Sequence, residues 1–347
     1  MGNGVIMKRL TIISFIVFIF ALFTSAQKIP KEQVSCKRIY GDGTTYCAFT
    51  TFVKAKDTYY LAFREADTHV SDGDYGKIRI LKSNDGDKWD LLQTLSKDQT
   101  DLRDPNLSVM PNGIVLLLCG ARRKQEMGKY QTTSEYSILT DTSFTNLIPV
   151  NYPLETTTGW IWKLTWHKGI GYGGCYQGGN RIDIVETLDG KNYKYLTTLK
   201  LFGKSYETKI LFDDNDNMMA FVRREPGIKG MMGLSRPPYF DWEWTELPIY
   251  LAGQELMIVE SKLLCVSRTQ YNIGAKTTLW WGGLDGDFSW SYTLPSMSKI
   301  GSDTGYVGII DNDTCLWISY YSTMKASKPS IYLAKVNKSY VGIKGQN

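Results

Sequence analysis

Tyr306 and Glu207 form a reasonable pair of a nucleophile and its base. Tyr306 ends the segment Asp303-Thr304-Gly305-Tyr306, shortly before the last strand-like runs. Glu207 lies just ahead of an acidic turn that begins at Asp213. A phenol is a weak nucleophile at neutral pH, so a neighbouring carboxylate must take its proton. The pair therefore predicts nucleophilic catalysis, with Tyr306 attacking and Glu207 assisting.

Three further carboxyl groups stand where proton transfer could use them. Asp72 and Asp74 lie in the polar segment 71–74, and Asp104 lies between Arg103 and Pro105. The proline is expected to hold Asp104 in extended backbone. Asp104 is then an acid, a base or a stabiliser of the transition state, and a salt bridge with Arg103 is the equally weighted alternative.

The two histidines and the aromatic run 160–167 supply groups that could bind a sugar. His69 is next to the acid-rich segment and is predicted to donate hydrogen bonds in the site. Trp162 is predicted to stack on a sugar ring, as aromatic side chains do in carbohydrate sites. His167 fits a surface position better.

These residues are far apart in sequence, so the fold must bring them together. Short β-branched or aromatic runs bounded by Gly, Asp, Asn or Pro recur along the chain, for example at 59–63, 114–118, 218–222 and 263–267. No amphipathic helical stretch exceeds about two turns. The pattern predicts an all-β protein.

Two turns share the form Ser/Thr-x-Asp-Gly-x-x-aromatic, at 83–89 and 187–193. In such a turn Asp caps backbone amides, Gly takes a positive φ and the aromatic ring packs back on the strands. The turns are 104 residues apart, which corresponds to two propeller blades of roughly fifty residues. A weaker echo occurs at 285–290. The spacing favours a six-bladed β-propeller over a β-sandwich.

The two turns resemble the Asp boxes of the sialidase-type six-bladed propellers. The stretch 60–83 is similar to the sialidase segment that runs from the second strand to the first Asp box. The resemblance implies that Asp72, or else Asp74, is the acid/base residue, and that Tyr306 and Glu207 are the nucleophile and its partner. It also implies that Arg223 and Arg268 bind a substrate carboxylate.

The sialidase pattern is broken at the first strand. Sialidases have Arg-Ile-Pro there, whereas the equivalent segment 47–50 contains no Arg. Arg64 is taken as the third member of the anion clamp, with Arg79 as the other candidate, and Arg103 is a further substrate-binding candidate. The chain therefore resembles a divergent subgroup of the superfamily.

These features together predict an exo-acting, sialidase-like glycoside hydrolase that removes a terminal sugar, with an acidic sugar favoured because Arg binds carboxylates bidentately. A non-catalytic carbohydrate-binding propeller would keep the Arg and aromatic residues without the carboxylate–phenol pair. A polysaccharide lyase acting on uronic acids would use Tyr and His as base and acid. No cofactor and no metal are expected, and the absence of any CxxC pair excludes a common type of zinc site.

Residues 1–26 are predicted to be a secretory signal peptide. Lys8 and Arg9 precede the apolar run 10–23, which closes on the small residues 24–26. That run is shorter than the roughly 20 residues a membrane span needs. Residues 27–347 are predicted to form a single β-propeller domain, exported to the periplasm or the extracellular space as a monomer without stable membrane insertion.

The amino-acid composition limits the classes of binding partner that are expected. The formal charge of +5 includes Lys8 and Arg9, and no basic cluster is interleaved with aromatics, so nucleic acid is not expected. The 22 Tyr and 10 Trp suit strands and sugar-binding surfaces. Cys119, Cys265 and Cys315 lie in apolar runs and are expected to be buried thiols.

Overall fold

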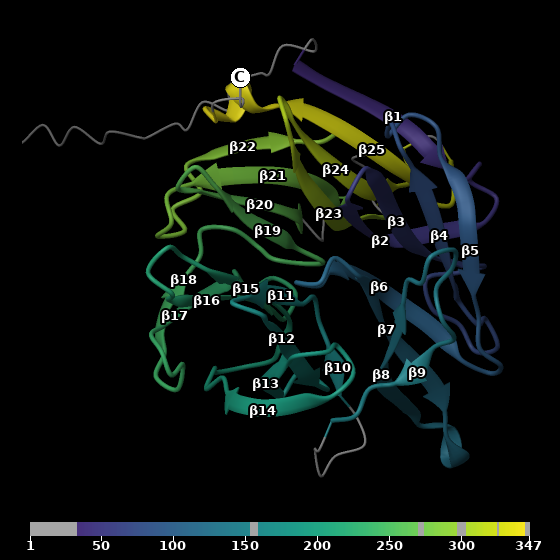
Figure 1. Ribbon diagram of the computed structural model, residues 1–347, viewed down its shortest axis with the longest axis horizontal. Coiled ribbons are helices and arrows are strands. Elements are labelled where there is room, and N and C mark those ends of the chain that lie inside the picture. The colour runs from purple at the N-terminus through teal and green to yellow at the C-terminus, as the bar shows by residue number, and fades with distance from the viewer. Residues whose placement is uncertain (1–32, 153–158, 270–273, 297–302, 325, 344–347) are drawn as a thin grey trace, which may run out of the picture.

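The computed structural model describes residues 33–152, 159–269, 274–296 and 303–343, except for 325. The predicted signal peptide lies outside these residues. The described chain forms six antiparallel sheets, five of four strands and one of five, arranged in a ring (Figure 1). The predicted all-β, six-bladed propeller is therefore confirmed.

Each blade has an inner strand at the centre of the ring and a second strand packed beside it (Figure 1). The inner strands are β2 (Tyr46–Ala55), β6 (Asp101–Val109), β10 (Trp160–Ile161) with β11 (Thr165–His167), β15 (Ser205–Phe212), β19 (Glu255–Val259) and β23 (Thr304–Asn312). The second strands are β3 (Thr58–Ala66), β7 (Val115–Lys124), β12 (Ile170–Gln177), β16 (Met218–Arg224), β20 (Lys262–Thr269) and β24 (Cys315–Ser322).

The outer half of each blade is more exposed. The third strands are β4 (Lys77–Ser83), β8 (Tyr130–Ile138), β13 (Arg181–Thr187), β17 (Met231–Ser235), β21 (Lys276–Gly282) and β25 (Ser330–Asn337). The outermost strands are β5 (Asp90–Leu95), β9 (Ile148–Pro149), β14 (Tyr193–Thr198), β18 (Glu243–Glu246), β22 (Trp290–Thr293) and β1 (Val34–Tyr40). Short 3-10 helices of the described chain include η2 (Glu126–Gly128) and η3 (Lys338–Val341).

The first strand closes the ring. β1 pairs antiparallel with β25, from Val34 opposite Val336 to Tyr40 opposite Ile331, so the N-terminal strand completes the C-terminal blade. This pairing joins the two ends of the propeller and leaves the last blade with four strands like its neighbours.

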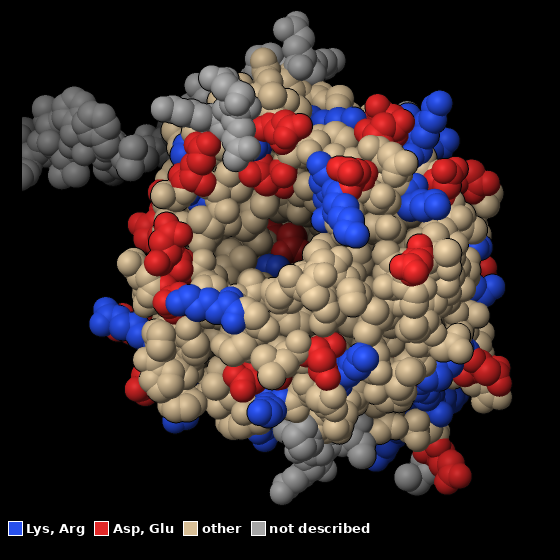
Figure 2. Space-filling model, viewed as in Figure 1, with Lys and Arg blue, Asp and Glu red and all other residues tan. Residues whose placement is uncertain are grey.

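The core lies between neighbouring blades. Because each sheet is covered on both faces, the second strands are buried along most of their length instead of alternating, as in Val115–Lys124. Between the fourth and fifth blades, for example, Phe221 packs in one cluster with Leu256 and Leu263. Cys119 and Cys265 are buried in such clusters as predicted, whereas Cys315 is only partly buried. Figure 2 shows a hollow at the centre of one face, with acidic and basic side chains at its bottom.

Among the described residues, no helix has the length and apolar character that a membrane span requires.

The two Asp-Gly turns have the same hydrogen bonds. Asp85 accepts from the amides of Asp87 and Lys88, and Asp189 accepts from those of Lys191 and Asn192, all at 2.8 to 2.9 Å. In the third segment, 285–290, Asp285 accepts from the amide of Asp287 at 3.4 Å, and the carboxylate of Asp287 accepts from the amide of Gly283 at 2.9 Å.

The glycines of these two turns are where one blade touches the next. Gly86 has φ of 72° and Gly190 has φ of 71°. A Cβ on Gly86 would lie 2.0 Å from the Trp317 ring in the adjacent blade, and one on Gly190 would lie 2.5 Å from Leu116. The turns therefore require glycine for backbone conformation and for blade-to-blade packing alike.

We expect Gly86→Ala to lower the free energy of unfolding by about 2–4 kcal/mol, because it adds a steric clash to a backbone strain of about 1 kcal/mol. Gly113→Ala is the matched control, since Gly113 has φ of 83° but nothing within 4 Å of its added Cβ. Urea unfolding of both variants measures the difference. Equal destabilisation of the two would show that the contact with Trp317 carries no packing energy.

Candidate active site

Four of the inner strands are interrupted at the same place. The pairing of β2, β6, β15 and β23 with its second strand slips by one residue near the start of the strand. Each slip is a two-residue bulge, and the bulges are Phe49–Thr50, Asp104–Pro105, Tyr206–Glu207 and Tyr306–Val307. Bulges aim side chains away from the plane of a sheet and are frequent beside active sites. Here they carry Asp104, Glu207 and Tyr306.

Three of the bulge residues have left-handed backbone. Phe49, Asp104 and Tyr306 have φ of 62°, 43° and 40°. The prediction that Pro105 holds Asp104 extended is therefore wrong, because the bulge imposes a positive φ instead. Such conformations cost about 1–3 kcal/mol for a non-glycine residue and cluster at functional sites.

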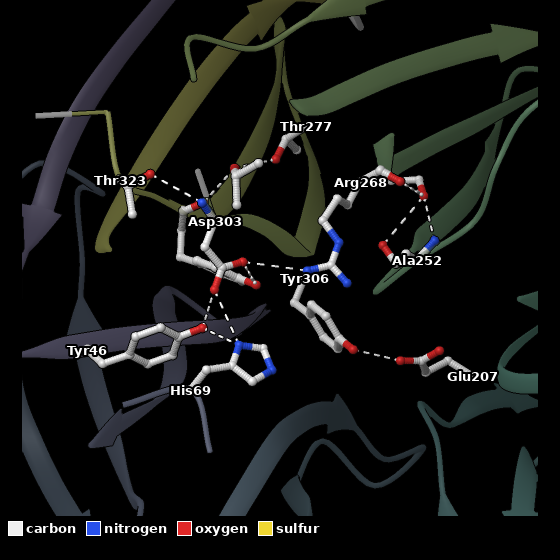
Figure 3. Close-up of polar contacts among 12 residues, drawn as sticks. Tyr46, His69, Glu207, Ala252, Arg268, Thr277, Asp303, Tyr306 and Thr323 are labelled. Carbon is white, nitrogen blue, oxygen red and sulfur yellow. Dashed lines mark hydrogen bonds and ion pairs between the residues drawn. The ribbon is translucent and has the colours of Figure 1, made fainter. Parts of the chain in front are cut away.

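The predicted nucleophile and its base are in direct contact. The hydroxyl of Tyr306 donates a 2.7 Å hydrogen bond to Oε1 of Glu207, although the residues are 99 positions apart in sequence (Figure 3). Nη1 of Arg223 donates to the same carboxylate oxygen at 2.6 Å and lies 3.3 Å from the Tyr306 hydroxyl. The phenol, the carboxylate and the guanidinium therefore form one group.

The Tyr306 ring is enclosed on several sides. It packs on Phe49 at 4.8 Å between ring centroids and lies against Gly253, where an added Cβ would come within 2.4 Å of the ring. The Arg268 guanidinium lies 5.6 Å from the ring centroid (Figure 3). Burial and the charge of Glu207 raise the pKa of Tyr306 well above its usual value of 10. The phenol therefore stays protonated until a base takes its proton.

Asp104 is a buried carboxyl group beside this pair. It is 5% exposed, and its Oδ1 has no hydrogen-bond partner among the described residues. Burial raises its pKa to about 6, with Arg103 opposing the rise and Glu207 adding to it. The alternative salt bridge is not formed, because Arg103 instead binds Asp101 and the His69 carbonyl.

A second polar group surrounds Asp303. Its Oδ2 accepts from the Tyr46 hydroxyl and lies 3.3 Å from Nδ1 of His69 (Figure 3). Its Oδ1 accepts from Tyr321 at 2.9 Å and lies 3.5 Å from Arg268. Burial opposes ionisation of Asp303, but the contacts with His69, Arg268 and Tyr46 outweigh it and lower the pKa.

Arg64 does not reach a substrate. Its side chain is fully buried and donates to Asp101 at 2.9 Å and to the carbonyl of Thr68 at 2.8 Å. The prediction that Arg64 completes the anion clamp is therefore wrong. Arg79, the other candidate, is bound to Glu65 at 2.6 Å. Arg103 is 11% exposed and also bound to Asp101, so its contact with substrate stays a prediction.

Asp72 and Asp74, on the loop between β3 and β4, bind partners outside the Tyr306 group. Asp72 is 65% exposed and forms an ion pair with Lys124 at 2.7 Å. Asp74 accepts from the amide of Thr68 at 2.7 Å and from that of Asp67 at 3.0 Å. These contacts do not support the predicted acid/base role for either residue, because an exposed ion pair and a loop cap already engage them.

Trp162 does not present a face to a sugar. Its side chain is 1% exposed and packs edge-on against Tyr306 at 5.8 Å. A ring buried this fully cannot stack on a ligand, so the predicted stacking role is wrong. Trp162 instead supports Tyr306 from within the core.

Sequence reasoning missed Asp303, Tyr46 and Asp101. Each stands three residues before a bulge residue, namely Tyr306, Phe49 and Asp104. Aligning the inner strands blade by blade would have revealed this shared offset. The bulges themselves leave no mark in the sequence that could have fixed that alignment in advance.

Comparison with solved structures identifies the fold. The chain is similar to a Dyadobacter fermentans protein of unknown function, with a TM-score of 0.74 and 16% identity over 88% of this chain and 99% of that one. It is similar to Trypanosoma rangeli sialidase in complex with the inhibitor DANA, with a TM-score of 0.67 and 12% identity over 88% of this chain and 60% of that one. The chain has the sialidase-type propeller fold.

A bacterial sialidase gives the same result. The K499G mutant of NanB sialidase from Streptococcus pneumoniae has a TM-score of 0.67 and 8% identity over 87% of this chain and 70% of that one. The chain spans 60% of the length of the T. rangeli enzyme. No protein-family model and no curated protein matches the sequence.

The raised pKa of Asp104 predicts how the free energy of unfolding depends on pH. Between its unfolded pKa of 3.8 and its folded pKa of about 6, the folded state binds the extra proton, so stability falls as the pH rises through that range. We expect Asp104→Asn to remove this loss, because asparagine stays neutral and tolerates a positive φ. The variant should match the wild type near pH 4 and exceed it by about 2–3 kcal/mol near pH 7.5.

Urea unfolding of both proteins across that pH range measures the effect. A constant difference between them at every pH would show that Asp104 ionises normally in the folded protein.

Proposed function

We propose that this protein is an exported, exo-acting glycoside hydrolase that removes a terminal, acidic sugar from a glycan. The observation that carries the proposal is the 2.7 Å hydrogen bond from the Tyr306 hydroxyl to Glu207. A phenol and a carboxylate so placed are the parts of a tyrosine nucleophile, which sialidases use in place of a second carboxylate. A propeller that only bound carbohydrate would not need this pair.

The chemistry follows from the contacts. Glu207 takes the phenolic proton as the Tyr306 oxygen attacks the anomeric carbon, and the bond to the leaving group breaks. The guanidinium of Arg223 stabilises the ionised form of Glu207, which is the form that accepts the proton. Water then releases the sugar in a second displacement, so the anomeric configuration is retained. A T. rangeli sialidase structure with 2,3-difluorosialic acid is described as a covalent intermediate.

Substrate binding is assigned to polar groups that lie near Tyr306. Asp104 has a buried oxygen without a partner among the described residues, so it suits a sugar hydroxyl. Arg223 and Arg268 are 15% and 13% exposed; Nη1 of Arg223 lies 3.3 Å from the Tyr306 hydroxyl and the Arg268 guanidinium lies 5.6 Å from the Tyr306 ring, so both are assigned to a substrate carboxylate. The deep burial of Glu207 and Tyr306 fits the end of a glycan better than its middle.

Export is part of the proposal and rests on the sequence of residues 1–26. The two Asp-Gly turns are proposed to be Asp boxes, on the basis of their shared hydrogen bonds.

We expect Tyr306→Phe and Glu207→Gln each to lower kcat/KM by about 10³-fold or more, because either change removes nucleophilic attack. The double variant should be little worse than either single one, since the two residues act as a unit. Hydrolysis of aryl glycosides of acidic and neutral sugars provides the measurement. Tyr59→Phe is the control, because that hydroxyl binds Asn312 outside the site.

Near-normal turnover by Tyr306→Phe would end the nucleophile assignment. A product that absorbs as an unsaturated sugar would identify a lyase instead.

A further inference from the structure

The glycosidic oxygen that leaves needs a proton, and the carboxylates expected to supply it are engaged elsewhere. Asp72 pairs with Lys124 and Tyr130, and Asp74 caps the amides of Asp67 and Thr68. The loop that carries them, between β3 and β4, also carries His69. This histidine lies beside the Tyr306 group, since its ring packs edge-on against Phe49 at 5.2 Å and Phe49 packs against Tyr306 at 4.8 Å.

The hydrogen bonds around His69 fix its tautomer. The Tyr46 hydroxyl donates to Asp303, so its oxygen is left to accept from Nδ1 of His69 at 2.6 Å. Asp303 lies 3.3 Å from the same nitrogen. Nδ1 therefore carries a proton, and Nε2 is the nitrogen available for proton exchange. Figure 3 shows this second nitrogen turned away from Asp303, toward the side where Tyr306 and Glu207 lie.

Buried charges hold the backbone of His69 in place. Arg103 donates to the His69 carbonyl at 3.0 Å, and Arg64 donates to the Thr68 carbonyl at 2.8 Å. Both guanidiniums are bound to the same carboxylate, Asp101. Asp74 accepts from the Thr68 amide at 2.7 Å. Arg64, Arg103 and Asp74 thus hold the backbone of residues 68–69, and Asp101 holds the two arginines. His69 is the titratable side chain of that segment.

We propose that His69, oriented by Asp303 and Tyr46, is the general acid and base of this site, an inference that rests on the proposed glycosidase function. In the first step, the protonated ring gives its Nε2 proton to the leaving oxygen while Glu207 accepts the proton of Tyr306. In the second step, neutral Nε2 takes a proton from the attacking water, and Tyr306 regains its own from Glu207. The ring and both partners return to their starting states.

The kinetic test uses two aryl glycosides of one sugar, with 2,4-dinitrophenol and with 4-methylphenol as leaving groups. The quantity compared is kcat/KM, which reports the first step alone. A good leaving group needs no proton in that step, so His69→Ala is expected to lower kcat/KM less than 10-fold with dinitrophenol and about 10²–10⁴-fold with methylphenol. Tyr306→Phe should lower both rates equally. His167→Gln, which alters the other histidine, is the control, because His167 stacks on Phe212 outside the site.

A structural test does not require turnover. In the His167→Gln variant the only imidazole is His69, so its ¹⁵N spectrum, recorded at a pH high enough to leave the ring neutral, reports which ring nitrogen carries the remaining proton. We expect the Nδ1–H tautomer, and Asp303→Asn should shift the population toward Nε2–H.

The outcomes separate the two assignments. Equal losses for His69→Ala on both glycosides, or an Nε2–H tautomer in the otherwise native protein, would overturn the role of His69 and leave the glycosidase proposal standing. A selective loss in Asp104→Asn and not in His69→Ala would transfer the role to Asp104. If the wild type cleaves no glycoside of the panel, the proposed function fails and this inference fails with it.

Discussion

The pairing of β1 with β25 is the constraint on which the rest of the structure depends. A propeller has no core in any single blade, because each sheet is buried only by its neighbours. The site draws Tyr46, Asp104, Glu207, Arg268 and Tyr306 from five blades, so its geometry exists only while the ring is closed. Closure is made by the residues farthest apart in sequence, Val34 with Val336 among them. The closing contact is thus non-local, and we expect it to form late in folding.

The bulges explain how a sheet can present functional groups at its innermost edge. A regular inner strand would point alternate residues into the two blade interfaces, where apolar side chains are required. Slipping the register by one residue turns Asp104 and Tyr306 out of that pattern. Positive φ at both residues costs free energy, and the surrounding burial of the blades holds the conformation in place. The strain is found at the residues to which the chemistry is assigned.

The sequence predicted the fold well, because strand length, turn chemistry and the spacing of the two Asp-Gly turns all reflect local physics. It also paired Tyr306 with Glu207, which the structure places in contact. It failed for Arg64 and Trp162, since burial depends on neighbouring blades that no local pattern describes. It could not show the contact of His69 with Asp303, because that contact joins positions 234 residues apart.

The charges of the site are closely balanced, and this bears on what it can bind. The guanidiniums are those of Arg64, Arg103, Arg223 and Arg268, and the carboxyl groups are those of Asp101, Asp104, Glu207 and Asp303. With all eight ionised these groups sum to zero, and the proton proposed on His69 adds one positive charge. Asp104 is the adjustable member, because its pKa of about 6 allows it to take a proton near neutral pH. An acidic sugar that binds here favours that protonation, and protonated Asp104 in turn favours the anion, since linkage acts in both directions. For the proposed acidic substrate, this protonation would compensate for the missing Arg of the first strand.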